Sequence, residues 1–296
     1  ACDYFNAVVF RCQLIVEAIM RRLFVIVDVQ KTAGGTASSD SSESSDERTD
    51  PGNLCELIDN QELRASQIGW GARMCFIGTD ISNFNYLVRQ STVHPSHDTV
   101  FHFANRQFSR KQTAHDLKHI PPEALERPDE NLAAELIEAY FAHVNRGWPI
   151  IDEAHFMHQY QGRNPRDPVA LSVMNAIFLA GGHVLSPTRS DVRAMLPTFF
   201  RRAKTLMDYR FEQDRMAYIQ TALLMTWYSD GLEEVVANAW HWIGMATRTA
   251  FGLGMHIDPS GSGMLPVHKR TWRRLWWVLF QFDTIVSASY GRPQAM

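Results

Sequence analysis

Cysteine is scarce in this chain. Four occur among 296 residues, at the widely separated positions Cys2, Cys12, Cys55 and Cys75. Small domains stapled by disulfides carry cysteine at a much higher density, so the count excludes a disulfide scaffold and favours a reducing compartment. Four closely spaced nitrogen or sulfur ligands, which a structural zinc ion prefers, are missing as well. We therefore expect no cofactor and no stoichiometric metal in this chain.

Long uninterrupted apolar runs are also missing. The most apolar region near the start, residues 7–29, contains Arg11, Glu17, Arg21 and Arg22. A spanning helix needs about 20 nearly uninterrupted apolar residues, so we expect no membrane partner.

A strong excess of charge of either sign is absent. The formal net charge is −3, which is not typical of a protein that coats nucleic acid through its overall field. The hydrophobic content of 45% is sufficient for one or two domains with a sizeable core.

Complete catalytic motifs are missing too. Residues 148–155 imitate the Asp-Glu-Ala-His box of nucleic-acid helicases, but the glycine-rich phosphate loop with its lysine does not occur. We read this segment as a loop that leads into a helix. The run 260–263 lacks the spacing of a nucleophile elbow. His155 and His158 lack the arrangement of zinc proteases, so we expect no enzyme activity.

His115 and Asp116 support an alternative from a different class. All-helical phosphohydrolases hold a divalent metal with such a doublet, and imidazole and carboxylate suit that ion. His119 lies one helical turn further on the same face. A polar region that also contains Lys111 and Lys118 is more typical of a solvated surface, so this reading is the runner-up.

Composition divides the chain into four segments. Residues 1–30 are apolar with scattered charges. Residues 31–52 are rich in serine and acids and contain no large apolar residue, which predicts a disordered linker. Residues 53–130 are mixed, and we expect an irregular connecting region that ends near Pro121 and Pro122.

Helical periodicity dominates residues 131–296. Ser190 is a candidate N-cap, and Gly147, Gly254 and Gly291 are candidate stops. The almost wholly apolar run 168–180 predicts a central buried helix. We expect an all-α domain whose helices lie near residues 132–144, 168–180, 190–207, 216–227, 233–253 and 268–288.

Tryptophan is dense in the second half of the chain. Core packing is the simpler interpretation, because each indole buries a large area. The alternative is an aromatic-lined cavity for an apolar inducer, since tryptophan is seldom buried completely and its N–H needs a partner. The candidate pocket residues are Trp227, Trp240, Trp242 and Trp276.

Several ordered motifs resemble one family. They are residues 136–145 followed by 148–152, residues 199–204, residues 239–246 with 252–256, and residues 273–277 followed by Asp283 and 291–293. In order and spacing this set resembles the fungal-specific transcription factor domain, the helical middle region of zinc-cluster regulators. Residues 76–80 with Ser82 and Asn83 are similar to the cutinase-regulator branch.

The resemblance implies a nuclear regulator of RNA polymerase II transcription. Members carry an N-terminal cluster of six cysteines with two zinc ions, which binds DNA, and a helical region that restrains the activator or senses a metabolite. DNA is the expected partner through that cluster, and a small-molecule inducer and a homodimer remain open.

The N-terminus departs from the family pattern. Cys2 and Cys12 occupy the first and third cysteine positions, but Phe5 stands where the second is expected. Two thiolates cannot hold the zinc cluster. We interpret residues 1–30 as a relic of the cluster or a gene-model artefact, and expect weak, salt-sensitive DNA binding through the basic residues of 269–274.

The family's helical region normally runs beyond the motif at 291–293. We therefore expect residues 131–296 to be an incomplete domain. Its last helix has apolar residues on several sides, which predicts exposed apolar surface, self-association and broad melting.

Overall fold

A computed structural model describes residues 67–68, 74–76, 102–104, 118–162, 168–212, 214–229 and 235–296. The chain divides into two compact units, residues 1–52 and 53–296, and every described residue belongs to the second. The segments predicted as a cluster relic and a linker, with Cys2 and Cys12, lie outside the described residues. So do His115 and Asp116 of the phosphohydrolase alternative.

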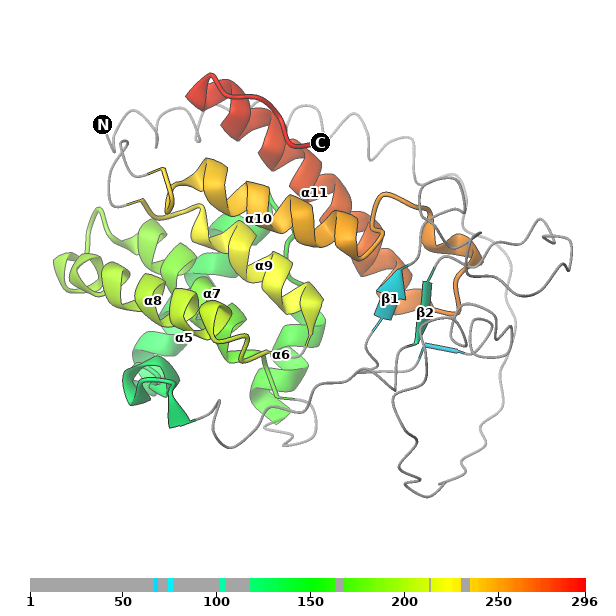
Figure 1. Ribbon diagram of the computed structural model, residues 1–296. Coiled ribbons are helices and arrows are strands. Elements are labelled where there is room, and N and C mark those ends of the chain that lie inside the picture. Colours follow the sequence, from blue (N-terminus) through cyan, green and yellow to red (C-terminus); the bar gives the residue numbers. More distant parts are fainter. Residues whose placement is uncertain are drawn as a thin grey trace, which may run out of the picture. The chain divides into compact units, whose positions relative to one another are not determined.

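Helices make up nearly all of the regular structure described (Figure 1). The prediction of an all-α fold is confirmed, and extended structure is limited, among described residues, to two three-residue strands and one isolated bridge. In chain order the elements are β1 (Met74–Phe76), β2 (His102–Ala104), η2 (Pro122–Leu125), α5 (Glu130–Ala139), η3 (Tyr140–Asn145), α6 (Glu153–Gly162), α7 (Leu171–Leu185), α8 (Ser190–Asp208), α9 (Arg215–Met225), α10 (Ala239–Gly252), η4 (Pro259–Gly261) and α11 (Pro266–Tyr290).

Helix α7 is the centre of the core, as its apolar sequence predicts. Every residue from 172 to 182 is buried, and the helix packs against α5, η3, α8 and α9. Gly181 makes this packing close, because a Cβ there would lie 2.0 Å from the carbonyl oxygen of Leu136. The close approach of α5 to the buried helix α7 therefore requires glycine at position 181.

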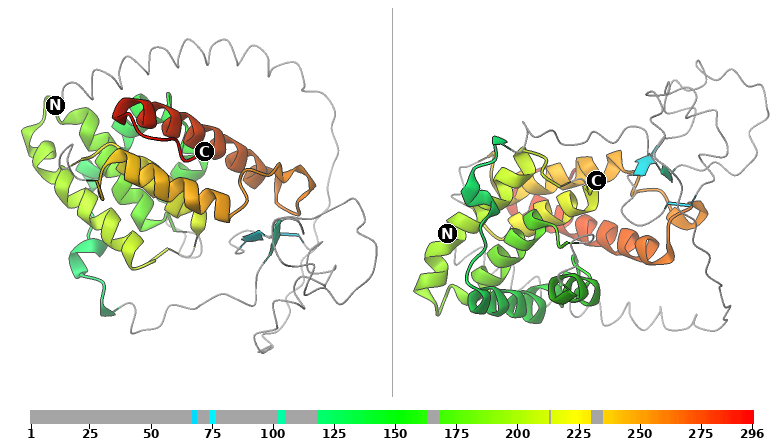
Figure 2. Two further views of the ribbon diagram at one scale, coloured as in Figure 1. Left: turned by 45° about the horizontal axis from the view of Figure 1, so that its top comes forward. Right: turned by 90° about the horizontal axis from the view of Figure 1, so that it is seen from below.

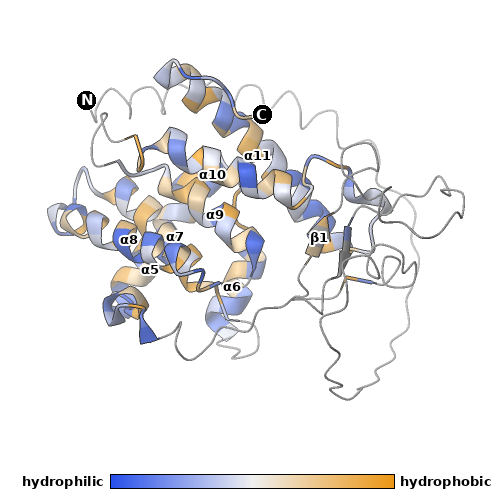
Figure 3. Ribbon diagram, viewed as in Figure 1, coloured by the Kyte–Doolittle hydropathy of each residue, from blue (hydrophilic) through white to orange (hydrophobic). Residues whose placement is uncertain are grey.

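Helix α8 buries one stripe of large apolar residues, including Phe199 and Phe200, and exposes Arg201. Hydrophobic residues alternate with hydrophilic ones along its surface in Figure 3, as expected of a helix covered on one side. The prediction that Ser190 is the N-cap is wrong. The helix begins at Ser190, and the cap position is Arg189, whose side chain makes no capping hydrogen bond.

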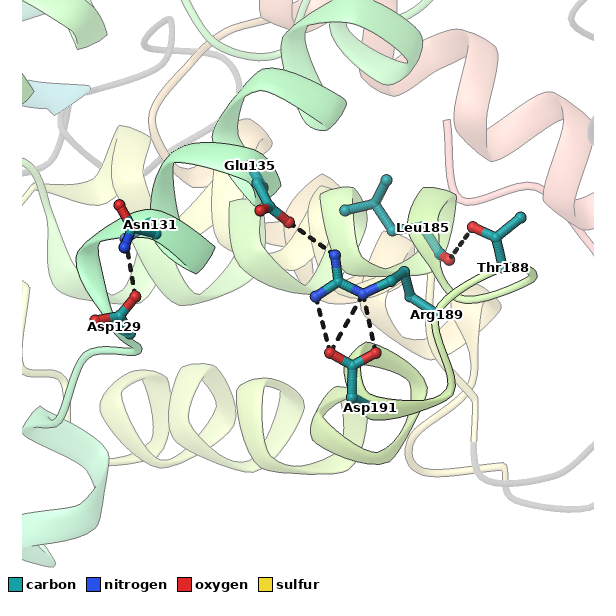
Figure 4. A network of polar contacts seen from close by, with 7 residues as sticks. All are labelled: Asp129, Asn131, Glu135, Leu185, Thr188, Arg189 and Asp191. Atoms are coloured by element: carbon teal, nitrogen blue, oxygen red, sulfur yellow. Dashed lines mark hydrogen bonds and ion pairs between the residues drawn. The ribbon is translucent and has the colours of Figure 1, made fainter.

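The Arg189 side chain instead joins two helices at this corner (Figure 4). Its guanidinium donates to Glu135 on α5 at 3.0 Å and to Asp191 on α8 at 2.8 Å. Hydrogen bonds from Arg189 lower the pKa of Asp191 to about 2. The arginine thus serves as an electrostatic link between α5 and α8.

The later helices follow each other in space as in the sequence. Helix α9 packs against α7 and α10, and α10 packs against α11. Helix α10 begins at Ala239, later than the predicted start at 233, because Asn238 is the N-cap and accepts from the amide of His241 at 3.0 Å. Residues 230–234 lie outside the described residues.

The predicted glycine stops are confirmed at two helix ends. Gly254 follows α10 with φ of 73°, and Gly291 follows α11 with φ of 60°. These left-handed conformations favour glycine, which has no Cβ to clash with the backbone. Of the described helices, none is long and apolar enough to cross a bilayer.

Upstream pieces of the chain contact the α10–α11 junction. Strands β1 and β2 pair antiparallel, with Phe76 opposite His102. Ile68 forms a parallel bridge with Met264, and its amide donates to Gly263 at 2.9 Å. This part of residues 53–130 is therefore packed onto the helical domain.

Candidate functional site

Helices α10 and α11 form an antiparallel pair, named here the α10–α11 hairpin, on which two of the four family-like motif sets fall. The two helices lie side by side in Figures 1 and 2. The start of α10 meets the end of α11, since Trp240 Nε1 donates to the carbonyl of Pro293 at 3.1 Å. The end of α10 meets the first half of α11, where the rings of Phe251 and Trp276 are 5.6 Å apart.

Asp283 fixes the turn that follows α11. Its side chain is buried, with 2% exposure. The carboxylate accepts from the amides of Ala295 at 2.9 Å and Met296 at 2.8 Å, and the amide of Arg292 donates to Ser287 at 2.9 Å. These bonds fold residues 292–296 back along the helix, which explains why Asp283 and the Gly-Arg-Pro run belong to one motif.

Arg292 adds a second contact at the same end. Its guanidinium lies over the ring of Trp240 at 5.0 Å and over that of Tyr290 at 5.3 Å. A cation held over aromatic faces is attracted by their quadrupoles. The end of the hairpin is therefore closed by an arginine between two aromatic rings.

Arg274 connects the middle of α11 to the segment before α6. It donates to Asp152 at 3.3 Å, and Asp152 also accepts from the amide of His155 at 3.1 Å. Burial raises the pKa of Asp152, but the His155 amide and Arg274 outweigh it, so the net pKa is lowered. The helicase-like box is thus a helix cap with an ion pair, and the reading of residues 148–155 as a loop entering a helix is confirmed.

A buried amide organises the same segment. Asn145, at the end of the π-helical turn η3, accepts from Tyr140 at 3.0 Å and from the amide of Ile151 at 3.1 Å, and donates to the Ile151 carbonyl at 3.1 Å. Burial raises the pKa of Tyr140 well above its usual value. Every polar atom that Asn145 presents here has a partner, so the network holds the loop against η3.

The other end of the hairpin carries a histidine cluster. His102 is buried, with 1% exposure, and its Nε2 lies 3.1 Å from the carbonyl of Gly254, to which the N–H tautomer donates. Burial lowers the pKa of His102, against two backbone hydrogen bonds that raise it. A Cβ atom on Gly254 would lie 2.2 Å from the ring of Phe76, so this position has no room for a side chain. The Phe76 ring also makes an edge-to-face contact with the ring of His256. Strands β1 and β2 are therefore docked on the glycine that ends α10.

The four tryptophans of the predicted inducer pocket have different neighbours. Trp227 contacts Phe282 at 5.3 Å, and Trp242 contacts Phe200 at 5.9 Å. Trp240 lies under Arg292, and Trp276 lies beside Phe251. The pocket stays a prediction; Trp242 is buried and packs in the core, whereas Trp276 is partly exposed and packs against Phe251.

Sequence reasoning did not select Asp283, Arg274 or Arg292 as site residues, although their motifs carried the resemblance. A single acid inside an otherwise apolar and basic helix was the signal for Asp283. Among the described residues there is no group of three histidine, cysteine or acidic side chains placed to hold a metal ion. His119 is exposed, and its proposed partners lie outside the described residues.

Together these features define a helical domain whose motif residues join its own elements through caps, ion pairs and buried hydrogen bonds. The chain belongs to the fungal specific transcription factor domain family, whose model matches residues 137–296. The predicted family is therefore confirmed.

Three relatives illustrate the similarity. The chain is 46% identical to the acetamidase regulatory protein of Aspergillus oryzae, over 82% of this chain and 31% of the relative. It is 44% identical to the acetamidase regulatory protein of Emericella nidulans, over 88% of this chain and 32% of the relative. It is 33% identical to cutinase transcription factor 1 alpha of Fusarium vanettenii, over 83% of this chain and 28% of the relative. The chain thus spans about a third of the length of these relatives.

These relatives are transcription regulators by name, as the sequence predicts. They lend no support to the His-Asp phosphohydrolase alternative. No solved structure matches the chain.

Proposed function

We propose that this chain is the helical regulatory region of a nuclear transcription regulator that controls amide utilisation. The observation that carries the proposal is the family match over residues 137–296, combined with 46% identity to an acetamidase regulatory protein. The cutinase regulator is less similar, at 33% identity, so a role in cutinase control is the second candidate.

The contacts of the acidic residues support a regulatory role without catalysis. Asp152, Asp214 and Asp258 accept from backbone amides at the starts of helices, and Asp283 accepts from the turn after α11. A general acid or base has to reach a proton on its substrate. Carboxylates bound to the protein's own backbone are engaged in holding the fold.

DNA recognition in this proposal belongs to a zinc cluster elsewhere in the regulator, and the chain itself holds no metal. Its most basic helix, α11, uses Arg273 to bind Asp258 at 2.8 Å and Arg274 to bind Asp152. These pairs reduce the positive charge left for phosphates. An inducer and a second copy of the chain are further partners of the regulator.

The α10–α11 hairpin is the part through which we expect regulation to act. It contacts the upstream strands at Gly254, the loop before α6 at Arg274, and the turn at residues 292–296. A ligand that favours one arrangement of these contacts shifts the population of the whole domain.

A reporter assay tests the regulatory role. The chain is fused between a heterologous DNA-binding module and a strong activating segment in fungal cells, and reporter transcription is measured with and without acetamide. We expect low activity without the amide, at least fivefold higher activity with it, and constitutive activity in the Asp283→Ala fusion. Equal activity of all fusions, at equal protein level, would contradict a regulatory role.

A deletion experiment distinguishes the two candidate pathways. Loss of the gene is expected to reduce acetamidase transcript and growth on acetamide as nitrogen source, with cutinase transcript unchanged. Loss of cutinase transcript alone would support the second candidate instead.

Two binding measurements test the cofactor and DNA statements. Elemental analysis of protein purified without chelator is expected to show no stoichiometric zinc or iron, and a full equivalent would revive the phosphohydrolase alternative. Gel-shift titrations are expected to show weak binding that falls steeply with salt. Sequence-selective binding at physiological salt would contradict this view.

A further inference from the structure

Residues 186–189 form the turn between α7 and α8, and their sequence is Ser-Pro-Thr-Arg. A serine followed directly by proline, with a basic residue three positions after the serine, is the pattern that proline-directed protein kinases accept. The chain contains 13 prolines, and Pro187 is the one that follows a serine or a threonine. The pattern therefore occurs once in the 296-residue sequence.

The turn presents Ser186 at the end of α7. Ser186 is the C-cap residue and is partly exposed, while Pro187 and Thr188 are exposed. The Ser186 hydroxyl donates a hydrogen bond of 2.8 Å to the carbonyl of His183, one turn earlier in the same helix. Because this bond is local, a kinase can engage the hydroxyl without separating two helices.

Proline also determines the backbone that a kinase meets. It has no N–H group, and the residue before it favours extended backbone. Ser186 has helical angles in the folded turn, with φ of −57° and ψ of −28°. When the turn opens, Ser186 and Pro187 adopt the extended form, in which kinases bind their substrates.

Two arginines lie beside this serine. Arg193, in the first turn of α8, is exposed, and its guanidinium donates to the carbonyl oxygen of Ser186 at 2.8 Å and 3.0 Å. Arg189 is 41% exposed and binds Asp191 and Glu135 (Figure 4). A phosphoserine carries nearly two negative charges and three acceptor oxygens, and arginine binds phosphate through parallel N–H donors. Arg193 is therefore placed to bind a phosphate on the residue whose carbonyl it already contacts.

We infer that Ser186 is phosphorylated by a proline-directed kinase and that Arg193 binds the resulting phosphate. In this step the Ser186 oxygen forms a bond to the γ-phosphorus of ATP, the bond from that phosphorus to the β–γ bridging oxygen breaks, and ADP leaves. The hydroxyl proton passes to a carboxylate of the kinase and then to solvent. The inference goes beyond the regulatory role proposed above and does not require it.

The phosphate changes the contacts that hold the turn between α7 and α8. It lies at the C-terminal end of α7, where the helix dipole disfavours negative charge. Arg193 offsets this cost, because its guanidinium turns from the Ser186 carbonyl to the phosphate oxygens. An ion pair thus replaces the present hydrogen bonds from Arg193 to the backbone.

Phosphorylation of the 296-residue chain by a purified cyclin-dependent kinase with ATP tests the site. Mass spectrometry is expected to find one phosphate, on Ser186, and Ser186→Ala should lower phosphate incorporation at least twentyfold. Ser190→Ala is the matched control, because Ser190 also lies beside Arg189 but is followed by an acid, and it should change incorporation less than twofold. A folded chain that stays unmodified, while a synthetic peptide of residues 180–194 is phosphorylated, would overturn the proposal.

Two further variants separate recognition of Arg189 from loosening of the turn. Arg189→Gln removes the cation three residues after the serine and is expected to slow phosphorylation at least fivefold. Glu135→Gln breaks one ion pair of Arg189 but keeps the cation, so phosphorylation should be as fast as before or faster. Equal slowing by both variants would contradict recognition of the Ser-Pro-Thr-Arg pattern.

The phosphate of the modified chain reports on Arg193. Its second pKa is near 6 in free phosphoserine, and we expect the guanidinium to lower that pKa in a titration followed by phosphorus nuclear magnetic resonance. Arg193→Gln should raise the pKa by about 0.3 or more, the size expected of an exposed ion pair. Arg201→Gln, at an exposed position further along α8, should leave it unchanged. The same pKa with and without Arg193 would overturn the role assigned to that arginine.

Phosphopeptide mapping of the regulator isolated from its own fungal cells tests whether the turn is accessible there. Phosphate is expected on Ser186 during growth with or without acetamide, and a Ser186→Ala strain should lose that phosphopeptide. Absence of phosphate from Ser186 under both conditions would overturn the proposal, whatever the result with the purified kinase.

Discussion

Helices α7 and α11 differ in charge and in their surroundings: α7 contains no lysine, arginine or acid, whereas α11 contains four cations and one acid. Both have apolar residues on several sides. Residues 172–182 of α7 are all buried between α5, η3, α8 and α9. Helix α11 buries one stripe, which includes Trp272, Leu275 and Leu279, and exposes Trp277 and Phe280 on another. Apolar residues on several sides of a helix thus predict that other elements pack against it. The tertiary structure decides which of those sides are covered.

The largest expected effect is a truncation in α7. Leu179 is fully buried, so Leu179→Ala removes buried methylenes and leaves a cavity at a cost of about 2–5 kcal/mol of unfolding free energy. Trp277→Ala on α11 is expected to change it by less than about 0.5 kcal/mol. Urea unfolding followed by circular dichroism measures both. A loss above about 2 kcal/mol for Trp277→Ala would show that α11 is covered in solution.

A close helix crossing can be broken by one methyl group. Gly181→Ala places a Cβ against the backbone of Leu136 on α5, and we expect a loss of about 1–3 kcal/mol from overpacking. Gly244→Ala in α10 is the control, because nothing lies within 4 Å of its Cβ. The control should stabilise the protein by up to about 1 kcal/mol through helix propensity. Thermal unfolding of the two variants should therefore shift in opposite directions.

The turn after α11 depends on one carboxylate. Asp283→Ala leaves the amides of Ala295 and Met296 without their acceptor, and we expect a cost of about 1–3 kcal/mol. Hydrogen exchange should become faster at residues 292–296, while α7 keeps its protection. Asp208→Ala, which removes an exposed ion pair with Lys204, should cost only about 0.3–0.5 kcal/mol. Unchanged exchange after α11 would contradict the role assigned to Asp283.

The smallest expected effect is the pH dependence of the stability that His102 contributes at the α10–α11 junction. Burial holds the pKa of His102 below its usual 6.5, so the unfolded chain binds the proton more readily than the folded chain. The contribution of His102 to stability is complete above about pH 6.5 and declines as the pH falls below that value. His102→Gln keeps a donor for Gly254 and should make the decline shallower between pH 7 and pH 5.

Most of the helices could be predicted from local pattern. The run 168–180 predicted a central buried helix, and α7 is that helix. Gly254 and Gly291 were recognisable as stops, because a left-handed residue after a helix favours glycine whatever lies around it. The N-cap at Ser190 was predicted wrongly, since a serine at the right place in a pattern does not show which residue adopts the extended cap conformation.

The site residues were harder to predict, because their partners are distant in the sequence. Asp152 and Arg274 are separated by 122 residues, and His102 and Gly254 by 152. Their sequence neighbours give no sign of these pairs. Asp283 was visible as an isolated acid in an apolar helix, but its acceptor role depends on a turn that returns the chain to it.

The sequence by itself determined the fold class, most helix positions and the family of this protein. Those properties follow from periodicity, from glycine conformation and from ordered motifs, all of which are local. Only the tertiary structure decided that α7 is covered on all sides and α11 is not, that Asp152 caps a helix and pairs with Arg274, and that Asp283 binds the amides of the turn after α11. The burial of a side chain and the formation of an ion pair or hydrogen bond depend on which helices pack together. The free energy of that packing comes from residues that are far apart in the chain.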